Sequence, residues 1–231
     1  MSWQLPVFLN NFNCLQSLQG MVAYLQKLPE VARVHIVDNG STYPPLLDWY
    51  QTAHGCVLHR LERNLHHRAP WTSGVVTSHT KGYDNYVVSD TDLDLSGIPH
   101  DFLQVLRAGL LKFPRRSKAG PALRIDDLPD AFPLKQEVVE WERQWWHPLD
   151  SQFYDAAIDT TFALYRTQQR PRVGGKHPDL RAAAPYVARH LPWYLTPATI
   201  TEEDKFRLNL CTGGHWSPKM KAVFGDLCPS V

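Results

Sequence analysis

The stretch Tyr86–Leu95, which reads Y-V-V-S-D-T-D-L-D-L, decides the fold class and most of the predicted site. Its first half is an apolar, β-branched run typical of a buried strand, and its second half carries carboxylates at every other position. Side chains two residues apart on an extended chain point the same way, so Asp90 and Asp92 can approach one ion where the strand ends. Asp94 continues this register and is the rival partner for Asp92. Oxygen ligands suit Mn²⁺ or Mg²⁺, so the sequence predicts a divalent metal site here. The alternative is an acidic loop that is solvated or caps a helix starting near Pro99.

A second predicted strand lies upstream and also ends in an acidic turn. Val34–Val37 is followed by Asp38 and the turn-forming residues Asn-Gly-Ser-Thr. Strand and helix patterns alternate around both segments, which predicts an α/β fold of the GT-A type with a mostly parallel central sheet flanked by helices. Ligands bind beyond the carboxyl ends of such strands, so we expect the Asp38 and Asp90 turns at one edge. The expected strands are 5–9, 34–37, 56–61 and 86–89, and the expected helices are 14–28, 44–50 and 70–79.

The second half of the chain has a different pattern, with expected helices at 102–113 and 134–146 and expected strands at 119–125 and 159–166. Val138, Trp141 and Trp145 recur at helical spacing and predict the apolar face of helix 134–146. The remainder is rich in Pro, Gly, His and aromatic residues, apart from one short helix near 201–210. No repeat or linker divides the chain. We therefore expect a single domain over 1–231, with a nucleotide-sugar-binding half (1–98) and an acceptor half with a C-terminal loop region (99–231).

Composition narrows the class of protein. The 231 residues are 43% hydrophobic, which is enough for a core, and the net charge of +1 indicates neither nucleic acid nor an anionic membrane as a partner. No apolar run is long enough for a transmembrane segment. The four cysteines form no C-x-x-C pair and are interpreted as reduced thiols, with a Cys211–Cys228 disulfide as the minority alternative. We expect a cytoplasmic protein, with a peripheral position at the inner membrane face left open.

The motifs of the first hundred residues resemble, in order, those of family 2-like glycosyltransferases. Val7–Asn13 is similar to their opening strand and turn, and V-H-I-V-D-N-G-S-T at 34–42 is similar to their second strand with its nucleotide-contacting Asp. Arg63-Asn64, followed by a helix and then by V-V-S-D-T-D at 87–92, resembles the approach to their D-x-D motif. The resemblance implies the GT-A fold, a nucleotide-diphospho-sugar donor and Mn²⁺ or Mg²⁺. The Q-x-x-R-W motif of processive members is absent.

The resemblance also implies a third metal ligand, frequently His, in the C-terminal half. His190 follows a predicted strand and His215 lies in a Gly-rich loop. We favour His190 over His215, because a strand end is the more rigid platform.

The nucleoside is expected at the same edge of the sheet. An ionised carboxylate only accepts hydrogen bonds, so Asp38 suits ribose hydroxyls or a base N–H, although its turn-forming role is the alternative. The groups that end the first strand are candidates to hold the base, and the resemblance adds Asn64. Arg68 could reach the nucleotide or its phosphates, or be an ordinary surface arginine. The expected nucleotide-binding residues are Asn11, Phe12, Asn13, Asp38, Asn64, Arg68 and Asp90.

The catalytic base is the least determined residue. An inverting enzyme needs a carboxylate to take the proton of the acceptor hydroxyl, whereas a retaining enzyme does not. The candidates in the second half are Asp126, Asp127, Glu140, Glu142 and Asp159. Of these we favour Asp127 or Glu142.

The predicted function is metal-dependent transfer of a hexose-like sugar from a nucleotide-diphosphate donor, preferably UDP-linked, to a glycan, lipid-linked or small hydroxyl acceptor. A sugar-nucleotide nucleotidyltransferase is the enzyme alternative, but residues 10–16 lack the Gly-rich basic loop that it needs. A non-catalytic nucleotide- or glycan-binding protein is the alternative from another class.

Overall fold

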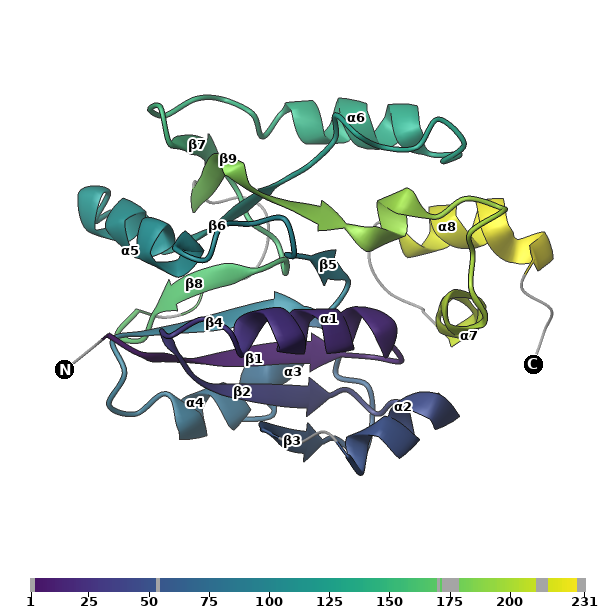
Figure 1. Ribbon diagram of the computed structural model, residues 1–231, viewed down its shortest axis with the longest axis horizontal. Coiled ribbons are helices and arrows are strands. Elements are labelled where there is room, and N and C mark those ends of the chain that lie inside the picture. The colour runs from purple at the N-terminus through teal and green to yellow at the C-terminus, as the bar shows by residue number, and fades with distance from the viewer. Residues whose placement is uncertain (1–2, 53–54, 170, 172–178, 211–215, 228–231) are drawn as a thin grey trace.

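A nine-stranded sheet runs through the molecule, with helices on both of its faces (Figure 1). This computed structural model describes residues 3–52, 55–169, 171, 179–210 and 216–227. The strand order is β3-β2-β1-β4-β8-β6-β9-β5, and β7 pairs with β9. The strands are β1 (Leu5–Asn11), β2 (Val31–Asp38), β3 (Cys56–Arg60), β4 (Asn85–Asp90), β5 (Leu93–Asp94), β6 (Lys118–Leu123), β7 (Phe153–Ala156), β8 (Ala163–Arg166) and β9 (Asp179–His190). The helices are α1 (Gln16–Leu25), α2 (Pro44–Tyr50), α3 (Ala69–Thr72), α4 (Val75–His79), α5 (Phe102–Lys112), α6 (Lys135–Arg143), α7 (Glu202–Leu210) and α8 (Ser217–Phe224), with short 3₁₀ turns η1 (His66–Arg68), η2 (Leu191–Tyr194) and η3 (Gly225–Leu227).

The first four strands are parallel, and their carboxyl ends form one edge. In the register of the sheet, Asn11 of β1 lies opposite Asp38 of β2, and Asn10 lies opposite Asp90 of β4. The prediction that the Asp38 and Asp90 turns share an edge is therefore confirmed. The predicted α/β class, with a central sheet flanked by helices, is confirmed as well.

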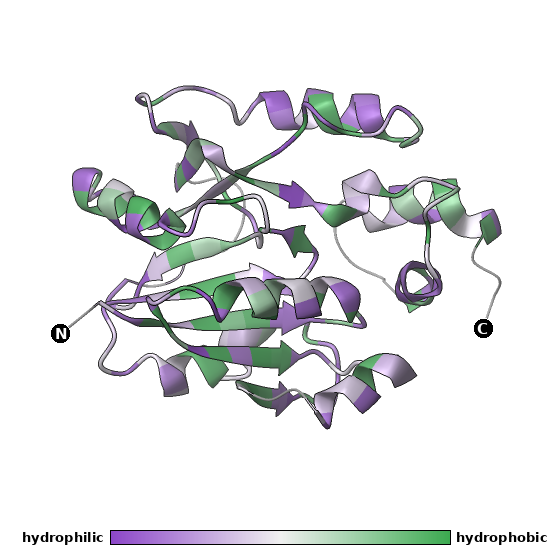
Figure 2. Cartoon of the chain, in the orientation of Figure 1, coloured by the Kyte–Doolittle hydropathy of each residue, from purple (hydrophilic) through white to green (hydrophobic). Residues whose placement is uncertain are grey.

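Alternating side chains of β1 and β2 enter two separate apolar layers, as the period of a strand requires. Leu9 and Ile36 belong to the large cluster that packs under α1. Phe8 points to the opposite face and packs with Tyr86 of β4 and Val76 of α4. Figure 2 shows the corresponding hydropathy, with apolar strands at the centre and hydrophilic residues along most of α6 and α7. Both faces of this half of the sheet are therefore covered, which explains why its strands read as near-continuous apolar runs.

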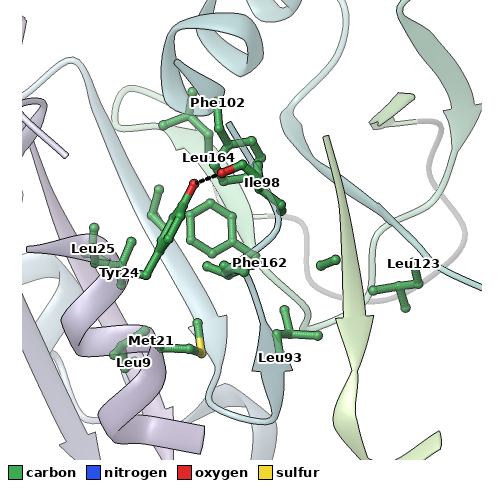
Figure 3. Close-up of a cluster of buried hydrophobic side chains, with 14 of the residues drawn as sticks. Leu9, Met21, Tyr24, Leu25, Leu93, Ile98, Phe102, Leu123, Phe162 and Leu164 are labelled. Carbon is green, nitrogen blue, oxygen red and sulfur yellow. Dashed lines mark hydrogen bonds between the residues drawn. The ribbon is translucent and has the colours of Figure 1, made fainter. Parts of the chain in front are cut away.

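One buried cluster joins the two halves of the chain (Figure 3). Tyr24 of α1 donates a hydrogen bond of 3.1 Å from its hydroxyl to the carbonyl of Ile98. Phe102 of α5 packs against Phe162, with ring centroids 5.1 Å apart. This contact places the loop before β8 next to α5, although the two are far apart in sequence.

The second half of the sheet is mixed. Strand β8 runs antiparallel to β4 and to β6, whereas β6 and β9 are parallel. The C-terminal end of β9 pairs antiparallel with β5, so that His190 lies opposite Leu93. The long strand β9 thereby brings its last residues back to the acidic segment after β4.

Two predicted elements differ in the structure. The expected helix 70–79 is two short helices, α3 and α4, because Gly74 adopts a left-handed conformation with φ of 80° between them. The expected strand 159–166 is reduced to β8, so Asp159 lies in the loop before it. Among the described residues, no helix is both long enough and apolar enough to cross a membrane.

The predicted apolar face of helix 134–146 is wrong in part. Val138 is buried as expected, but Trp141 is 42% exposed and Glu142 is buried instead. The reason is an ion pair, because Glu142 accepts a hydrogen bond of 2.7 Å from Arg181 of β9. A charged partner on the facing strand thus overrides the apolar spacing of α6.

Candidate functional site

The carboxyl ends of β1 and β4 are joined by side-chain hydrogen bonds. Asn10 donates from Nδ2 to Oδ1 of Asp90 over 3.1 Å. The hydroxyl of Thr91 donates to Oδ1 of Asn11 over 2.7 Å, and both of these residues are buried. The predicted residue Asn11 is therefore part of the internal framework of the edge, and it orients the first residue after β4.

Asp38 is fully buried, and its carboxylate is occupied by protein groups. Its Oδ1 accepts from the Tyr50 hydroxyl at 3.0 Å, and its Oδ2 accepts from the backbone N–H of Ser41 at 3.3 Å. Arg60 lies 3.5 Å from the same Oδ2. Burial, followed by the charge of Asp38, raises the pKa of Tyr50, so this hydroxyl stays protonated and acts as a donor. These contacts establish the turn-forming role of Asp38, and its contact with a nucleoside stays a prediction.

Asn13 joins the turns that follow β1 and β2. Its Oδ1 accepts from the backbone N–H groups of Thr42 and Tyr43 at 2.8 and 3.0 Å, and its own N–H donates to the Ser41 hydroxyl at 2.9 Å. The residue has a φ of 54°, a left-handed conformation that Asn tolerates better than most residues. Its neighbour Phe12 is half-buried at the same turn.

The loop that carries Asn64 and Arg68 is attached to this edge through a residue that the sequence analysis did not select. Asn39 accepts from the N–H of Leu65 at 2.7 Å and donates to the carbonyl of His66 at 3.0 Å. Asn64 accepts from the N–H of His66 at 2.7 Å, while Arg68 is exposed in η1. The only signal for Asn39 was its place directly after Asp38.

Asp90 has an unusual electrostatic environment. Burial, the nearby Asp92 and, more weakly, Asp159 raise the pKa of Asp90 to about 7, while hydrogen bonds from Thr160 and Asn10 oppose the shift. The backbone N–H of Asp90 also donates to the carbonyl of Thr160 at 3.1 Å. Carboxylates held close together in this way favour either a proton or a cation between them.

Asp92 contacts two residues from distant parts of the chain. Arg207 of α7 lies 3.3 Å from its Oδ2, and Nε2 of His190 lies 3.6 Å from its Oδ1. The N–H of Leu191 also donates to the carbonyl of Asp92 at 2.9 Å, which extends the β5–β9 pairing. The predicted neighbours Asp92 and His190 are thus brought together, whereas the alternative His215 lies outside the described residues.

The donor atoms around Asp92 fit a divalent cation. Burial lowers the pKa of His190, with Asp92 opposing and Arg207 reinforcing the shift, so the imidazole is in the neutral form that a metal binds. Its Nδ1 is buried without a hydrogen-bond partner. Among the described residues, only a histidine cluster elsewhere places three potential ligand atoms within 4.8 Å of one another. The ligand atoms of Asp90, Asp92 and His190 are more widely spaced. A bound ion would therefore have to draw these three side chains together.

A cleft of about 400 Å³ opens beside Asp92, a size typical of small-molecule sites. It lies between α1, β5, η2 and α7, and Asp94, Tyr194 and Arg207 contribute to its walls. The buried residues Asn11 and Asp38 do not line it. A larger hollow of about 530 Å³ lies beside Trp3, Glu30 and Arg107, near the start of β1 and away from the carboxyl ends of the strands. We assign the candidate site to the cleft at Asp92, because Asp92 lines it and is in contact with His190, although neither His190 nor Asp90 lines the cleft itself.

The two favoured candidates for the base are both held in ion pairs. Asp127 accepts hydrogen bonds from Tyr194 and Arg189, which lower its pKa although burial acts in the opposite direction. Glu142 is 3% exposed and pairs with Arg181 near the start of β9, whereas His190 is the last residue of that strand, so the structure does not bring Glu142 to the site. The lowered pKa makes Asp127 a weak proton acceptor. Burial raises the pKa of Glu142 against the opposing charge of Arg181, but its carboxylate is held by that arginine away from the acidic edge.

Asp159 is the candidate that the structure places near Asp90. It is exposed in the loop between β7 and β8, and its charge contributes to the raised pKa of Asp90. The loop is fixed from below by the fully buried Lys118, whose ammonium donates to the carbonyl of Ile158 at 2.5 Å and lies 3.7 Å from Asp179. The sequence analysis missed Lys118, because nothing in its local pattern distinguishes it from a surface lysine.

Comparison with known proteins yields likenesses of fold at low sequence identity. A mannosyltransferase from Pyrobaculum calidifontis, solved with GDP-Man and Mn²⁺, is 12% identical with a TM-score of 0.48, over 97% of this chain and 80% of that one. Glucosyl-3-phosphoglycerate synthase from Mycobacterium tuberculosis is 15% identical (TM-score 0.45), and TarS from S. aureus is 14% identical (TM-score 0.42). These last two structures each match 71% of this chain, and the match covers 57% of the synthase and 47% of TarS. No protein-family model and no curated protein sequence matches the chain. In fold, the chain is similar to solved glycosyltransferases.

Proposed function

We propose that this protein is a metal-dependent glycosyltransferase of the GT-A type that transfers a sugar from a nucleotide-diphosphate donor, preferably UDP-linked, to a hydroxyl acceptor. One observation carries the proposal. Asp90 at the end of β4 and Asp92 just after it lie at the carboxyl edge of the parallel half of the sheet, and β9 brings His190 to within 3.6 Å of Asp92. Ligands of α/β sheets bind at this edge.

Asp90, Asp92 and His190 would hold the divalent ion. When bound, such an ion supplies positive charge to the diphosphate that leaves with the nucleoside. The carboxylates supply the oxygen ligands that Mn²⁺ and Mg²⁺ prefer, and the neutral imidazole favours Mn²⁺ of the two. Arg207 is 3.3 Å from Asp92, so its guanidinium lies beside the place proposed for the diphosphate.

The nucleoside is proposed to bind above the turns that follow β1 and β2. Phe12 is half-buried there and offers a ring face to a base, and Arg68 is exposed. Asp38 is fully buried and held by Tyr50, so direct contact with a ribose or base requires the Tyr50 side chain to move away. Otherwise Asp38 acts by holding the turn in shape.

For proton transfer we propose Asp159 rather than Asp127 or Glu142. Its carboxylate is exposed near Asp90, and no ion pair involves it within the described part of the chain. Lys118 donates a hydrogen bond to the backbone carbonyl of Asp159, which holds the loop that carries this carboxylate. This role applies to an inverting reaction.

Calorimetry with UDP and GDP tests the proposal, in the presence of Mn²⁺ and after treatment with EDTA. We expect Mn²⁺ to be required for tight binding, and Asp90→Asn or Asp92→Asn to weaken it by at least about tenfold. Asp130→Asn is the matched control, because Asp130 is an exposed aspartate paired with Lys135. Equal affinity with and without the metal would exclude an ion that bridges the diphosphate. Binding without turnover of any nucleotide sugar, by hydrolysis or transfer, would instead support the non-catalytic alternative.

A further inference from the structure

Three histidines converge on the face of the sheet opposite α1. His35 of β2 is buried, His59 of β3 is half-buried and His79 of α4 is exposed. One nitrogen from each ring lies within 4.8 Å of the other two. His35 is three residues before Asp38 on the same strand, so the cluster is about 10 Å from the end of β2. It is therefore separate from the acidic edge described above.

The ring orientations match those of metal ligands. His35 Nδ1 and His59 Nε2 are 2.9 Å apart, so one of these nitrogens must donate to the other when no ion is bound. His79 Nδ1 is 2.9 Å from the carbonyl of Val75, and a carbonyl can only accept. The proton of neutral His79 is therefore on Nδ1, and its Nε2 keeps a free lone pair. Metal-binding histidines are oriented by this kind of carbonyl contact.

We propose that His35, His59 and His79 form a binding site for a divalent late transition-metal ion of the Zn²⁺ class. Imidazole nitrogens suit Zn²⁺, Cu²⁺ or Ni²⁺, whereas Mn²⁺ and Mg²⁺ prefer the oxygen ligands of the acidic edge. Tetrahedral Zn²⁺ with Zn–N bonds of about 2.05 Å separates its ligand nitrogens by about 3.3 Å. The ion would thus replace the His35–His59 hydrogen bond with a small expansion of that pair and an inward movement of exposed His79.

The charge state of the cluster supports the same conclusion. Burial lowers the pKa of His35 to about 4, and the neighbouring His59, His79 and Arg33 add to this shift. Burial and then His79 also lower the pKa of His59. Both rings are therefore neutral at pH 7 and ready to bind a metal without first losing a proton. Arg33 opposes a second cation, so we expect Arg33→Gln to tighten metal binding.

Three protein ligands leave one coordination position of Zn²⁺ open to water, as in sites that are not purely structural. The exposure of His79 provides the path by which the ion enters. Binding would join α4 to the paired strands β2 and β3, and His79 already packs against their histidine rings, with centroids 4.7 Å from His35 and 4.9 Å from His59.

Zinc titration of the full chain tests the proposal, in a background that removes the acidic edge as a competing site. The background variant is Asp92→Asn/His190→Gln, and its fold is checked by circular dichroism. We expect one equivalent of Zn²⁺ to bind it, and Co²⁺ to give the visible absorption of a tetrahedral site. Adding His79→Ala should weaken Zn²⁺ binding by at least about tenfold and remove the Co²⁺ spectrum. Adding His147→Ala, which truncates an exposed histidine outside the cluster, should leave both unchanged.

His79 is exposed, so its replacement does not endanger folding, and His59→Gln provides a second variant. Sugar transfer by His79→Ala in the otherwise wild-type chain should be unchanged, because His79 is outside the proposed active site. The proposal is overturned if the background variant binds no Zn²⁺, or if His79→Ala and His59→Gln bind it as tightly as the background does.

Discussion

The ion pair between Arg207 and Asp92 leads to a prediction whose direction is opposite to that of most active-site substitutions. Arg207→Met should strengthen the binding of Mn²⁺ alone. In the metal-free protein the guanidinium lies 3.3 Å from Oδ2 of Asp92, and their side chains are 16% and 21% exposed. A cation that binds Asp92 must displace this group or tolerate its charge. Methionine keeps much of the length of the side chain and removes both obstacles.

The magnitude follows from the geometry. Two unit charges 3.3 Å apart interact by about 5 kcal/mol at an effective dielectric constant near 20. Loss of hydration by both groups cancels most of this value, and measured exposed pairs contribute up to about 1 kcal/mol. For this partly buried pair we expect about 1–2 kcal/mol, which corresponds to Mn²⁺ affinity higher by roughly five- to thirtyfold.

Calorimetric titration with MnCl₂, without nucleotide, measures this effect. Lys205→Met is the matched control, because it removes one positive charge from the same helix and Lys205 pairs with Glu202 rather than with Asp92. Its effect should be small in 0.15 M salt, where the screening length is about 8 Å. If Arg207→Met binds Mn²⁺ no better than Lys205→Met does, Arg207 does not compete with the metal and Asp92 is not its ligand.

Three further predictions concern catalysis, packing and pH. Asp159→Asn should lower kcat by at least about 100-fold at unchanged donor affinity, and normal turnover would exclude it as the base. Gly120→Ala should destabilise the protein by about 3 kcal/mol in urea unfolding, since its Cβ would lie 2.1 Å from the carbonyl of Phe162, whereas the open Gly97→Ala should change little. Because the pKa of His35 is lowered in the folded protein, only the unfolded state gains this proton as the pH falls from 6.5 to 5. In EDTA the free energy of unfolding should therefore fall by about 2 kcal/mol over this range. An equal fall in His35→Gln would contradict this assignment.

The parallel half of the fold was predictable because its signals are local. Each strand from β1 to β4 is a short, mostly apolar run, and acidic turns come at the ends of β2 and β4. The general rule that ligand-binding residues lie at the carboxyl ends of strands in α/β sheets was then sufficient to place Asp38 and Asp90 at one edge. The same reasoning selected His190 at a strand end. Its pairing opposite Leu93 depends on the full length of β9 and was not readable from the sequence.

The base could not be predicted because its candidates differ only in their long-range partners. Glu142 and Asp127 look like solvated carboxylates in sequence, yet Arg181 and Arg189, which lie some forty and sixty residues downstream, pair with them. Asp159 became the better candidate only when the pairing of β8 with β4 brought the preceding loop to Asp90. Apolar periodicity also failed on α6 for this reason, because it does not account for a buried ion pair.

The alternation of side chains along one strand, β2, keeps the two candidate metal sites apart. Along β2, Val34 and Ile36 enter the core under α1, while His35 points to the opposite face and stacks on Phe8 at 4.8 Å. A shift of one residue in register would bury His35 under α1 and destroy the histidine cluster. Three nitrogen ligands therefore gather on one face, whereas the proposed site at the carboxyl edge combines two carboxylates with one imidazole, and the two sites select different ions. Traces of Zn²⁺ would bind to the histidines without supporting nucleotide binding. The number of metal ions bound per chain therefore does not report occupancy of the proposed active site. The Mn²⁺ dependence must be measured on protein from which a chelator has first removed bound metal.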